Sequence, residues 1–317
     1  MSKSTRLAGM AFAWPLFAWA QSPSPEGVPA QIPVHIMVTL GHHYGGVLAA
    51  LTQDEVTVTQ RFDPQRITSL TPLRGDRGGL ELFLLVDDFS SCEPGSKFEE
   101  VRRFIDSQLP TTAVGVAYIH NGNLEVIENP TRDRQRAVMA LSAPSGSKPA
   151  SPFKALAELI RGWPQGPSRR AVVMISNGID PEAKELGPDA SADGAIEAAQ
   201  RAGVPIYAIY HPSADYQTQD YSKIYAGQVQ LAHVAGETGG EAYFLGMGPL
   251  PSLVPFLADI ADHLANQYLL EFLANPSDGP GALQEVTVKS KVPDVELIVP
   301  SKAWVPGSSP DQKHKAS

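Results

Sequence analysis

Residues 80–91 read LELFLLVDDFSS, and this stretch decides the fold. Its first seven residues are almost all apolar, which is typical of a strand that is buried on both faces in a parallel sheet. The strand ends in two acidic residues, Asp87 and Asp88. Adjacent carboxylates at the end of a buried strand repel each other and lose hydration, so this ending predicts a cation or hydrogen-bond donors beside them.

Strand and helix patterns alternate from this stretch to residue 268. Further apolar strand patterns lie at 112–120, 169–176, 204–210 and 241–245, and helical patterns separate them. The segment 124–129 follows an Asn121-Gly122 turn and is expected to pair antiparallel with 112–120. This alternation predicts an α/β fold with a doubly wound, mostly parallel sheet and helices on both faces.

The segments on either side of this body have β character. Residues 32–79 and 269–306 both contain short runs of alternating apolar residues, separated by turn-forming stretches. Because the two segments are alike in size and patterning, we expect them to pair in one small accessory β-sheet beside the α/β body.

The first 20 residues have the features of an export signal. Lys3 and Arg6 precede an apolar run, and residues 18–20, AWA, supply a small-residue cleavage pattern. Residues 21–31 are expected to form a flexible lead-in, and the polar tail 307–317 is expected to be disordered. After removal of the signal we expect no membrane span, and a protein located in the periplasm or outside the cell.

The charge and the cysteine content argue against nucleic-acid binding and against an intramolecular disulfide. The chain carries 25 Lys and Arg against 34 Asp and Glu, a net charge of −9. This acidic balance argues against a nucleic-acid partner, because binding to phosphates depends on basic side chains. Cys92 is the only cysteine, so no intramolecular disulfide can form and stability must come from packing.

Polar residues gather where strands of the predicted sheet end. Ligands of doubly wound sheets bind in the crevice outside the carboxyl ends of the strands, so these are the candidate binding residues. They are Asp87, Asp88, Ser90 and Ser91 after the first strand, Asn177 and Asp180 after the strand 169–176, and Ser151 at the start of a helix.

Five segments resemble, in their order and spacing, the landmarks of von Willebrand factor type A (VWA) domains: LLVDDFSS, SPFKALAELI, MISNGID, VPIYAIY and GETGGEAYFL. The resemblance covers residues 80–268, and the flanks are similar to those of a bacterial, acidobacterial subgroup. Members of the family hold a divalent cation, commonly Mg²⁺, in a metal-ion-dependent adhesion site. Its ligands come from an Asp-x-Ser-x-Ser motif, a Thr at a helix start and an Asp before Gly. The resemblance therefore implies a Mg²⁺ or other divalent-cation site at the candidate residues named above.

The chain departs from the family motif. Starting the motif at Asp87 replaces its middle Ser by Phe89, and starting it at Asp88 replaces its last Ser by Cys92. Asn177 stands where the family has Asp, which removes a charge but keeps a carbonyl oxygen. A cation-bound site and a metal-free site therefore both stay open.

Two of the candidate residues, Ser151 and Asn177, also have structural interpretations, and Asp180 has a further role in the cation site. Asp180 is expected to compensate through water for the charge that Asn177 lacks. Ser151 before Pro152 is a good helix cap by itself, and Asn177-Gly178 is a common turn sequence.

The leading hypothesis is an exported binding module rather than an enzyme. In this hypothesis the carboxyl-end face of the sheet captures a protein or surface ligand, through an acidic group of the partner that completes the cation's coordination. One alternative is a metal-free structural scaffold of the cell envelope, whose β flanks join other chains by edge pairing. Another is a metal-assisted hydrolase that uses Asp87 or Asp88 with a cation-bound water.

Overall fold

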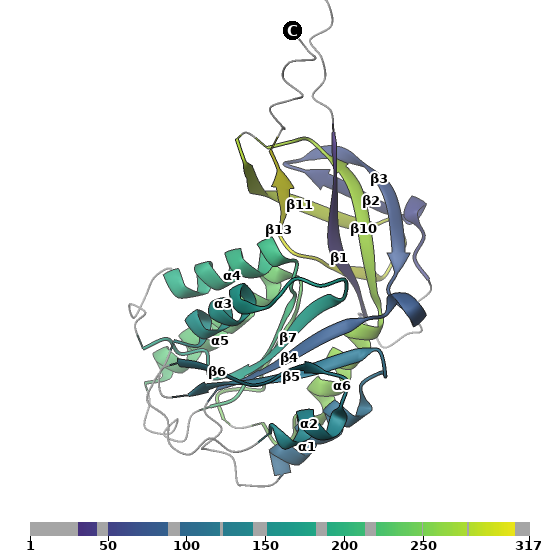
Figure 1. Cartoon of the computed structure of the whole chain (residues 1–317). Coiled ribbons are helices and arrows are strands. Elements are labelled where there is room, and N and C mark those ends of the chain that lie inside the picture. Colours follow the sequence, from purple (N-terminus) through teal and green to yellow (C-terminus); the bar gives the residue numbers. More distant parts are fainter. Residues whose placement is uncertain are drawn as a thin grey trace, which may run out of the picture.

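The computed structural model describes residues 31–42, 50–87, 96–120, 123–141, 151–181, 189–212, 220–248, 250–277 and 279–307. These residues form two units, each built around one sheet (Figure 1). The expected export signal, the Asn121-Gly122 turn and nearly all of the polar tail lie outside the described residues. No helix among the described residues is long and apolar enough to cross a membrane.

The first unit is a seven-stranded sheet made from both ends of the chain. Its strands, in spatial order, are β12 (Val295–Ile298), β1 (Ile32–His42), β10 (Gln267–Ala274), β3 (Asp63–Pro72), β2 (Val56–Gln60), β11 (Gly281–Ser290) and β13 (Lys302–Pro306). All of its pairings are antiparallel. The flanks predict a small accessory sheet, but the observed sheet is larger. It has seven strands, whereas the sheet of the α/β body has six.

Alternation along the strands gives this sheet one apolar face and one polar face. In β1, Val34, Ile36 and Val38 are buried while His35 is exposed, so one face of the strand carries the apolar side chains. The sheet curls (Figure 1). Its inward-facing side chains form one apolar core that includes Phe272 of β10.

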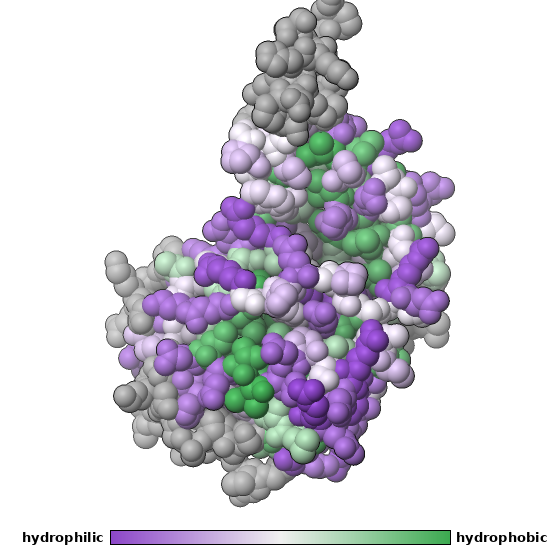
Figure 2. All heavy atoms as spheres, in the orientation of Figure 1, coloured by the Kyte–Doolittle hydropathy of each residue, from purple (hydrophilic) through white to green (hydrophobic). Residues whose placement is uncertain are grey.

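The second unit contains a mixed six-stranded sheet. Its strands, in spatial order, are β6 (Asn123–Thr131), β5 (Thr112–His120), β4 (Leu80–Val86), β7 (Arg169–Ser176), β8 (Ile206–Tyr210) and β9 (Ala242–Tyr243). β6 pairs antiparallel with β5 as expected, and the other pairings are parallel. Figure 2 shows apolar patches on both units of a largely hydrophilic face.

Helices cover the six-stranded sheet on both faces. Their bounds are α1 (Ser96–Ser107), α2 (Arg134–Met139), α3 (Pro152–Gly162), α4 (Ala190–Ala202), α5 (Tyr221–Thr238) and α6 (Val254–Ala265). Leu82 and Leu84 of β4 belong to one core with α1, α2 and α6, whereas Phe83 and Leu85 belong to a second core with α3, α4 and α5. The continuous apolar run of β4 is therefore explained by burial on both faces.

The winding of the chain reverses at β4. From β4 the chain passes to β5 on one side, and it later returns to β7 on the other side of β4. In parallel sheets the crevice for a ligand opens at such a reversal, outside the carboxyl ends of the two strands. The residues that follow β4 and β7 therefore occupy the position where a binding site is expected.

The two units are joined by two connections that lie side by side. One runs from β3 to β4 and the other from α6 to β10. The Leu73 amide donates to the Gln267 carbonyl at 2.9 Å, and the Arg74 guanidinium donates to the Asn266 side-chain oxygen at 2.6 Å. The α/β body is thus inserted between the two halves of the seven-stranded sheet.

Candidate functional site

Asp87 directly follows β4 and is held against β7. Its backbone N–H donates to the Ile175 carbonyl at 2.8 Å, which extends the strand pairing by one residue. The Ser176 hydroxyl donates to Asp87 Oδ2 at 2.7 Å. The carboxylate is therefore fixed at the reversal point by a hydroxyl group from the neighbouring strand.

Ser151 and Asp180 form a second hydroxyl–carboxylate pair. Ser151 is the N-cap of α3, with Pro152 following it, and its hydroxyl oxygen accepts from the Lys154 amide at 3.3 Å. The same hydroxyl donates to Asp180 Oδ2. Both side chains are buried. Ser151 thus caps its helix, as the sequence indicated, and also holds the carboxylate of the segment that follows β7.

The turn after β7 is formed by Asn177 and Gly178. The Asn177 side-chain oxygen accepts from the Ile179 amide at 2.8 Å, and the Gly178 amide donates to the Ser176 hydroxyl oxygen at 3.0 Å. Gly178 has a φ of 67°, which favours glycine. Gly227 of α5 faces this turn, so glycines on both sides let the helix approach closely. The Asn177 side-chain oxygen therefore stabilises the turn in which Asn177 lies.

The described part of the predicted site thus consists of Asp87, Ser151, Asn177 and Asp180. All four lie at the carboxyl ends of β4 and β7 or at the start of α3, and Ser176 joins them. Asp88, Ser90 and Ser91 lie outside the described residues.

The donor set of this site fits a hard cation. Two carboxylates and two hydroxyls offer the oxygen ligands that Mg²⁺ prefers. In a cation-bound site, the Asp180 carboxylate beside Ser151 would supply the charge that Asn177 lacks. Asp87, Ser151 and Asp180 are the described residues that would hold a cation, and a bound cation would polarise a ligand oxygen there.

Substitution of Ser151 tests its role as a cap. We expect Ser151→Ala to lower the free energy of unfolding by about 1 kcal/mol, because the Lys154 amide and the buried Asp180 carboxylate each lose a partner. Ser151→Thr keeps the hydroxyl and is expected to stay within about 0.5 kcal/mol of the original. Urea denaturation measures both changes, and equal losses in the two variants would contradict the role of the hydroxyl.

His211 is a buried residue of this region that sequence reasoning missed. It follows β8, and its backbone N–H donates to the Ser176 carbonyl at 2.9 Å. A polar residue directly after the apolar strand 204–210 was the available signal. The carboxyl ends of β4, β7 and β8 therefore all contribute to this end of the sheet.

A second group of ionisable side chains lies at β9 and α6, away from the predicted residues. Asp259 and His263 are four residues apart on α6, and Glu241 immediately precedes β9. His263 Nδ1 lies 3.7 Å from Glu241 Oε2, and the Tyr243 hydroxyl donates to Asp259 Oδ2 at 2.8 Å. The helical spacing of Asp259 and His263 was visible in the sequence, but only the tertiary fold brings Glu241 to them.

Burial and neighbouring charge raise the pKa of two groups in this cluster, Glu241 and Tyr243. Burial, with the nearby carboxylates of Asp259 and Glu296, raises the pKa of Glu241 above its ordinary value of 4.5. Burial and the Glu241 charge likewise raise the pKa of the Tyr243 hydroxyl, which therefore stays protonated and can donate to Asp259. The cluster is thus a place where negative charge is costly.

The pH dependence of stability tests this cost. A raised carboxyl pKa means that ionisation of Glu241 opposes folding at neutral pH, and that this penalty disappears as the pH falls through the folded-state pKa. We expect Glu241→Gln to raise the thermal midpoint at pH 7 by roughly 1–2 °C, and to change nothing at about pH 3. Scanning calorimetry at both pH values measures this, with Glu125→Gln as an exposed control. A gain that persisted at the lower pH would contradict the charge argument.

No family model matches the chain, and no curated protein matches it. Solved structures do match. Those neighbours include von Willebrand factor type A domains.

Three of these VWA neighbours illustrate the likeness. The ArnB paralog VWA2 from Sulfolobus acidocaldarius is 10% identical at a TM-score of 0.37, with 90% of this chain and 78% of that chain covered. The vWF domain of the type V pili tip protein Mfa5 from Porphyromonas gingivalis is 10% identical at 0.42, with 61% and 95% covered. The SpRpn10 VWA domain is 16% identical at 0.37, with 56% and 93% covered. Because these TM-scores are all below 0.5, we rest the functional proposal on this chain's own side chains.

Proposed function

We propose that this chain is an exported binding module of the adhesion type, which captures a protein or surface ligand at the carboxyl ends of β4 and β7. The observation that carries the proposal is the pair of hydroxyl–carboxylate contacts at the reversal of the winding, Ser176 with Asp87 and Ser151 with Asp180. Partners of doubly wound sheets bind at this edge, so oxygen ligands gathered there support the proposal.

A divalent cation is part of this proposal. The carboxylates of Asp87 and Asp180 supply negative charge for Mg²⁺, and the hydroxyls are neutral ligands that leave the cation with net positive charge. An acidic group on the partner is the chemistry that such a cation recognises. The chain itself carries no catalytic role in this proposal.

A metal-free scaffold is the second candidate, and two observations favour it. Ser151 and Asn177 each have a structural task in the described structure, as a helix cap and in a turn. β6 forms an edge of the six-stranded sheet and exposes Val126 and Ile127, which are groups suited to contact with another chain.

Thermal unfolding of the protein with Mg²⁺, Mn²⁺, Ca²⁺ or EDTA separates the two candidates. A cation that binds only the folded state stabilises it by about 2.7 kcal/mol at a concentration one hundred times its Kd. We therefore expect one of these ions to raise the midpoint by roughly 5–10 °C, and Asp87→Asn to abolish that rise.

Asp63→Asn is the matched control. It removes the same charge, and Asp63 is exposed in the seven-stranded sheet. The cation proposal fails if no ion shifts the midpoint, or if Asp87→Asn responds like Asp63→Asn. The scaffold then remains, and its association should survive in EDTA.

A further inference from the structure

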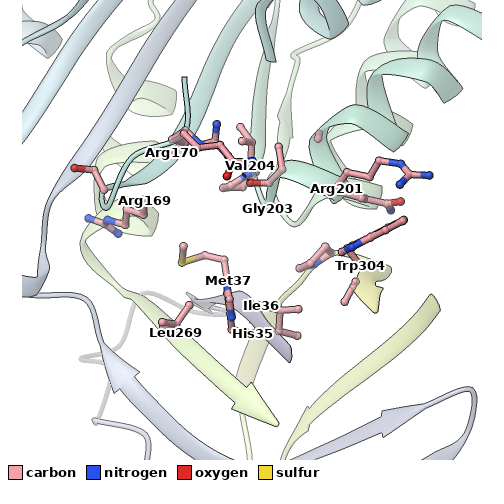
Figure 3. A pocket seen from close by; sticks show the side chains of 18 of the residues that line it. His35, Ile36, Met37, Arg169, Arg170, Arg201, Gly203, Val204, Leu269 and Trp304 are labelled. Carbon is pink, nitrogen blue, oxygen red and sulfur yellow. Dashed lines mark hydrogen bonds between the residues drawn. The ribbon is translucent and has the colours of Figure 1, made fainter. Parts of the chain in front are cut away.

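A cleft separates the two units at the end of the α/β body opposite to the proposed binding face. Its volume is about 700 Å³. Arg169, Val204 and Pro205 line it from the amino ends of β7 and β8, and β1, β10 and β13 line it from the seven-stranded sheet. Figure 3 shows Arg169 at one end of this cleft and Trp304 with Arg201 at the other. The cleft therefore belongs to neither unit alone.

The middle of the cleft is apolar. Met37 of β1 and Leu269 of β10 are directly paired across the two strands, and both line the cleft from the outer face of the curled sheet. Val204 lies across from them (Figure 3). Trp304 lines one end, because alternation along β13 turns it outward while Ala303 and Val305 are buried in the sheet's core.

The cleft also gathers positive charge in an acidic protein. Six of its lining residues are Lys or Arg and one is an acid, Asp76, whereas the whole chain has 25 bases and 34 acids. Arg201 is paired with Glu197 at 2.8 Å, and Lys302 stands opposite Glu285 in the strand register. Arg170 lies near Glu81, so the other three bases are at the opposite end of the cleft, where Asp76 is the single acid.

That other end is built by Arg77, Arg132 and Arg169. Arg77 lies in the connection just before β4, Arg132 follows β6, and Arg169 begins β7, so all three come from adjoining ends of one sheet. Among the described residues none of the three has an ion-pair partner within 4.0 Å. Like charges brought together in this way favour an anion between them.

Arg169 gives an independent indication of an anion. Its guanidinium donates to the Leu264 carbonyl and to the Gln267 side chain, but its Nε is buried without a hydrogen-bond partner in the described structure. Burial lowers the pKa of this guanidinium to about 10. A buried cation that is satisfied only by neutral groups is costly, and an anion nearby would offset that cost.

We propose that this cleft binds a small organic anion, with an apolar body between Met37, Leu269 and Val204 and a carboxylate or phosphate group beside Arg77 and Arg132. Such a ligand spans both units and holds them in one relative arrangement. The site is separate from the proposed adhesion face, because it opens at the amino ends of the strands and uses none of that face's residues.

Fluorescence titration with 8-anilinonaphthalene-1-sulfonate tests this proposal, because the probe combines an aromatic body with one anionic group. We expect saturable binding of one probe per chain. The double variant Arg77→Glu with Arg132→Glu is expected to raise the Kd of the probe about tenfold. The control is Arg66→Glu with Arg103→Glu, which makes the same change of charge at exposed residues outside the cleft and should leave the Kd unchanged.

Competition identifies the chemistry of the bound group. Decanoate and decyl phosphate are both expected to displace the probe, and whichever has the lower inhibition constant shows whether the site prefers carboxylate or phosphate. Inorganic phosphate has no apolar body and should not displace it. Met37→Glu places a carboxylate on the apolar floor and should weaken probe binding even if the arginine variant is poorly folded. Equal Kd values in the arginine variant and its control, or probe binding that Met37→Glu leaves unchanged, would overturn the proposal.

Discussion

Replacement of Gly178 by alanine is expected to lower the free energy of unfolding by about 3 kcal/mol. Gly178 has a φ of 67°, where a side chain strains the backbone. An added Cβ would also lie 2.4 Å from the Gly227 carbonyl oxygen and 2.6 Å from Leu231 Cγ. Helix α5 would have to move away from the turn after β7, which carries Asn177 and Asp180. The loss of stability and the disturbance of the candidate site therefore share one cause.

Replacement of Gly194 by alanine is a matched control, for which the expected change in the free energy of unfolding has the opposite sign. Gly194 lies inside α4, and apart from its own helix backbone and chain neighbours no described atom lies within 4 Å of its added Cβ. Alanine there should stabilise the protein by about 0.5–1 kcal/mol, because it reduces the freedom of the unfolded chain and favours the helix. Guanidinium denaturation of both variants measures the difference. Equal effects at the two positions would show that the close approach at Gly178 does not constrain the fold.

Truncation of Phe153 to alanine is expected to cost about 3–5 kcal/mol. Phe153 has an exposed fraction of 0% and packs in the core between the six-stranded sheet and the helices α3, α4 and α5. Removal of its ring leaves a cavity that the surrounding strands can fill only in part. Because Phe153 lies two residues after Ser151, the loss also loosens the start of α3.

Phe62→Ala supplies the comparison for this effect. Phe62 is 88% exposed at the turn between β2 and β3, so its truncation should change the free energy of unfolding by less than about 0.5 kcal/mol. Thermal and urea unfolding together measure both variants. If Phe153→Ala lowered the free energy of unfolding no more than Phe62→Ala, Phe153 would not be packed in the core between α3 and the sheet as described.

The parts of the fold that depend on local patterns could be predicted from the sequence. The apolar run of β4, the Ser151-Pro152 helix start and the left-handed Gly203 at the end of α4 each carry their own signal. The candidate residues that follow β4 and β7 were found because parallel strands end at the same edge of a sheet. Local patterns are short-range, so they work where the structure is decided by nearby residues.

Features that need distant segments could not be predicted in this way. The pairing of Asp180 with Ser151 joins two loops whose separation in space the sequence does not state. The cluster of Glu241 with His263 depends on how β9 meets α6, and the arginine-lined cleft depends on how the two units sit together. Each arises from tertiary packing, for which periodicity carries no information.

The insertion of the α/β body into the seven-stranded sheet has a consequence for synthesis of the chain. β1 pairs with β10, and β2 pairs with β11, so strands made before the α/β body must pair with strands made after it. During that time the α/β body can fold around its own more local parallel pairings, while the early strands have open edges. We therefore expect the seven-stranded sheet to form more slowly than the α/β body, because its contacts are more distant in sequence.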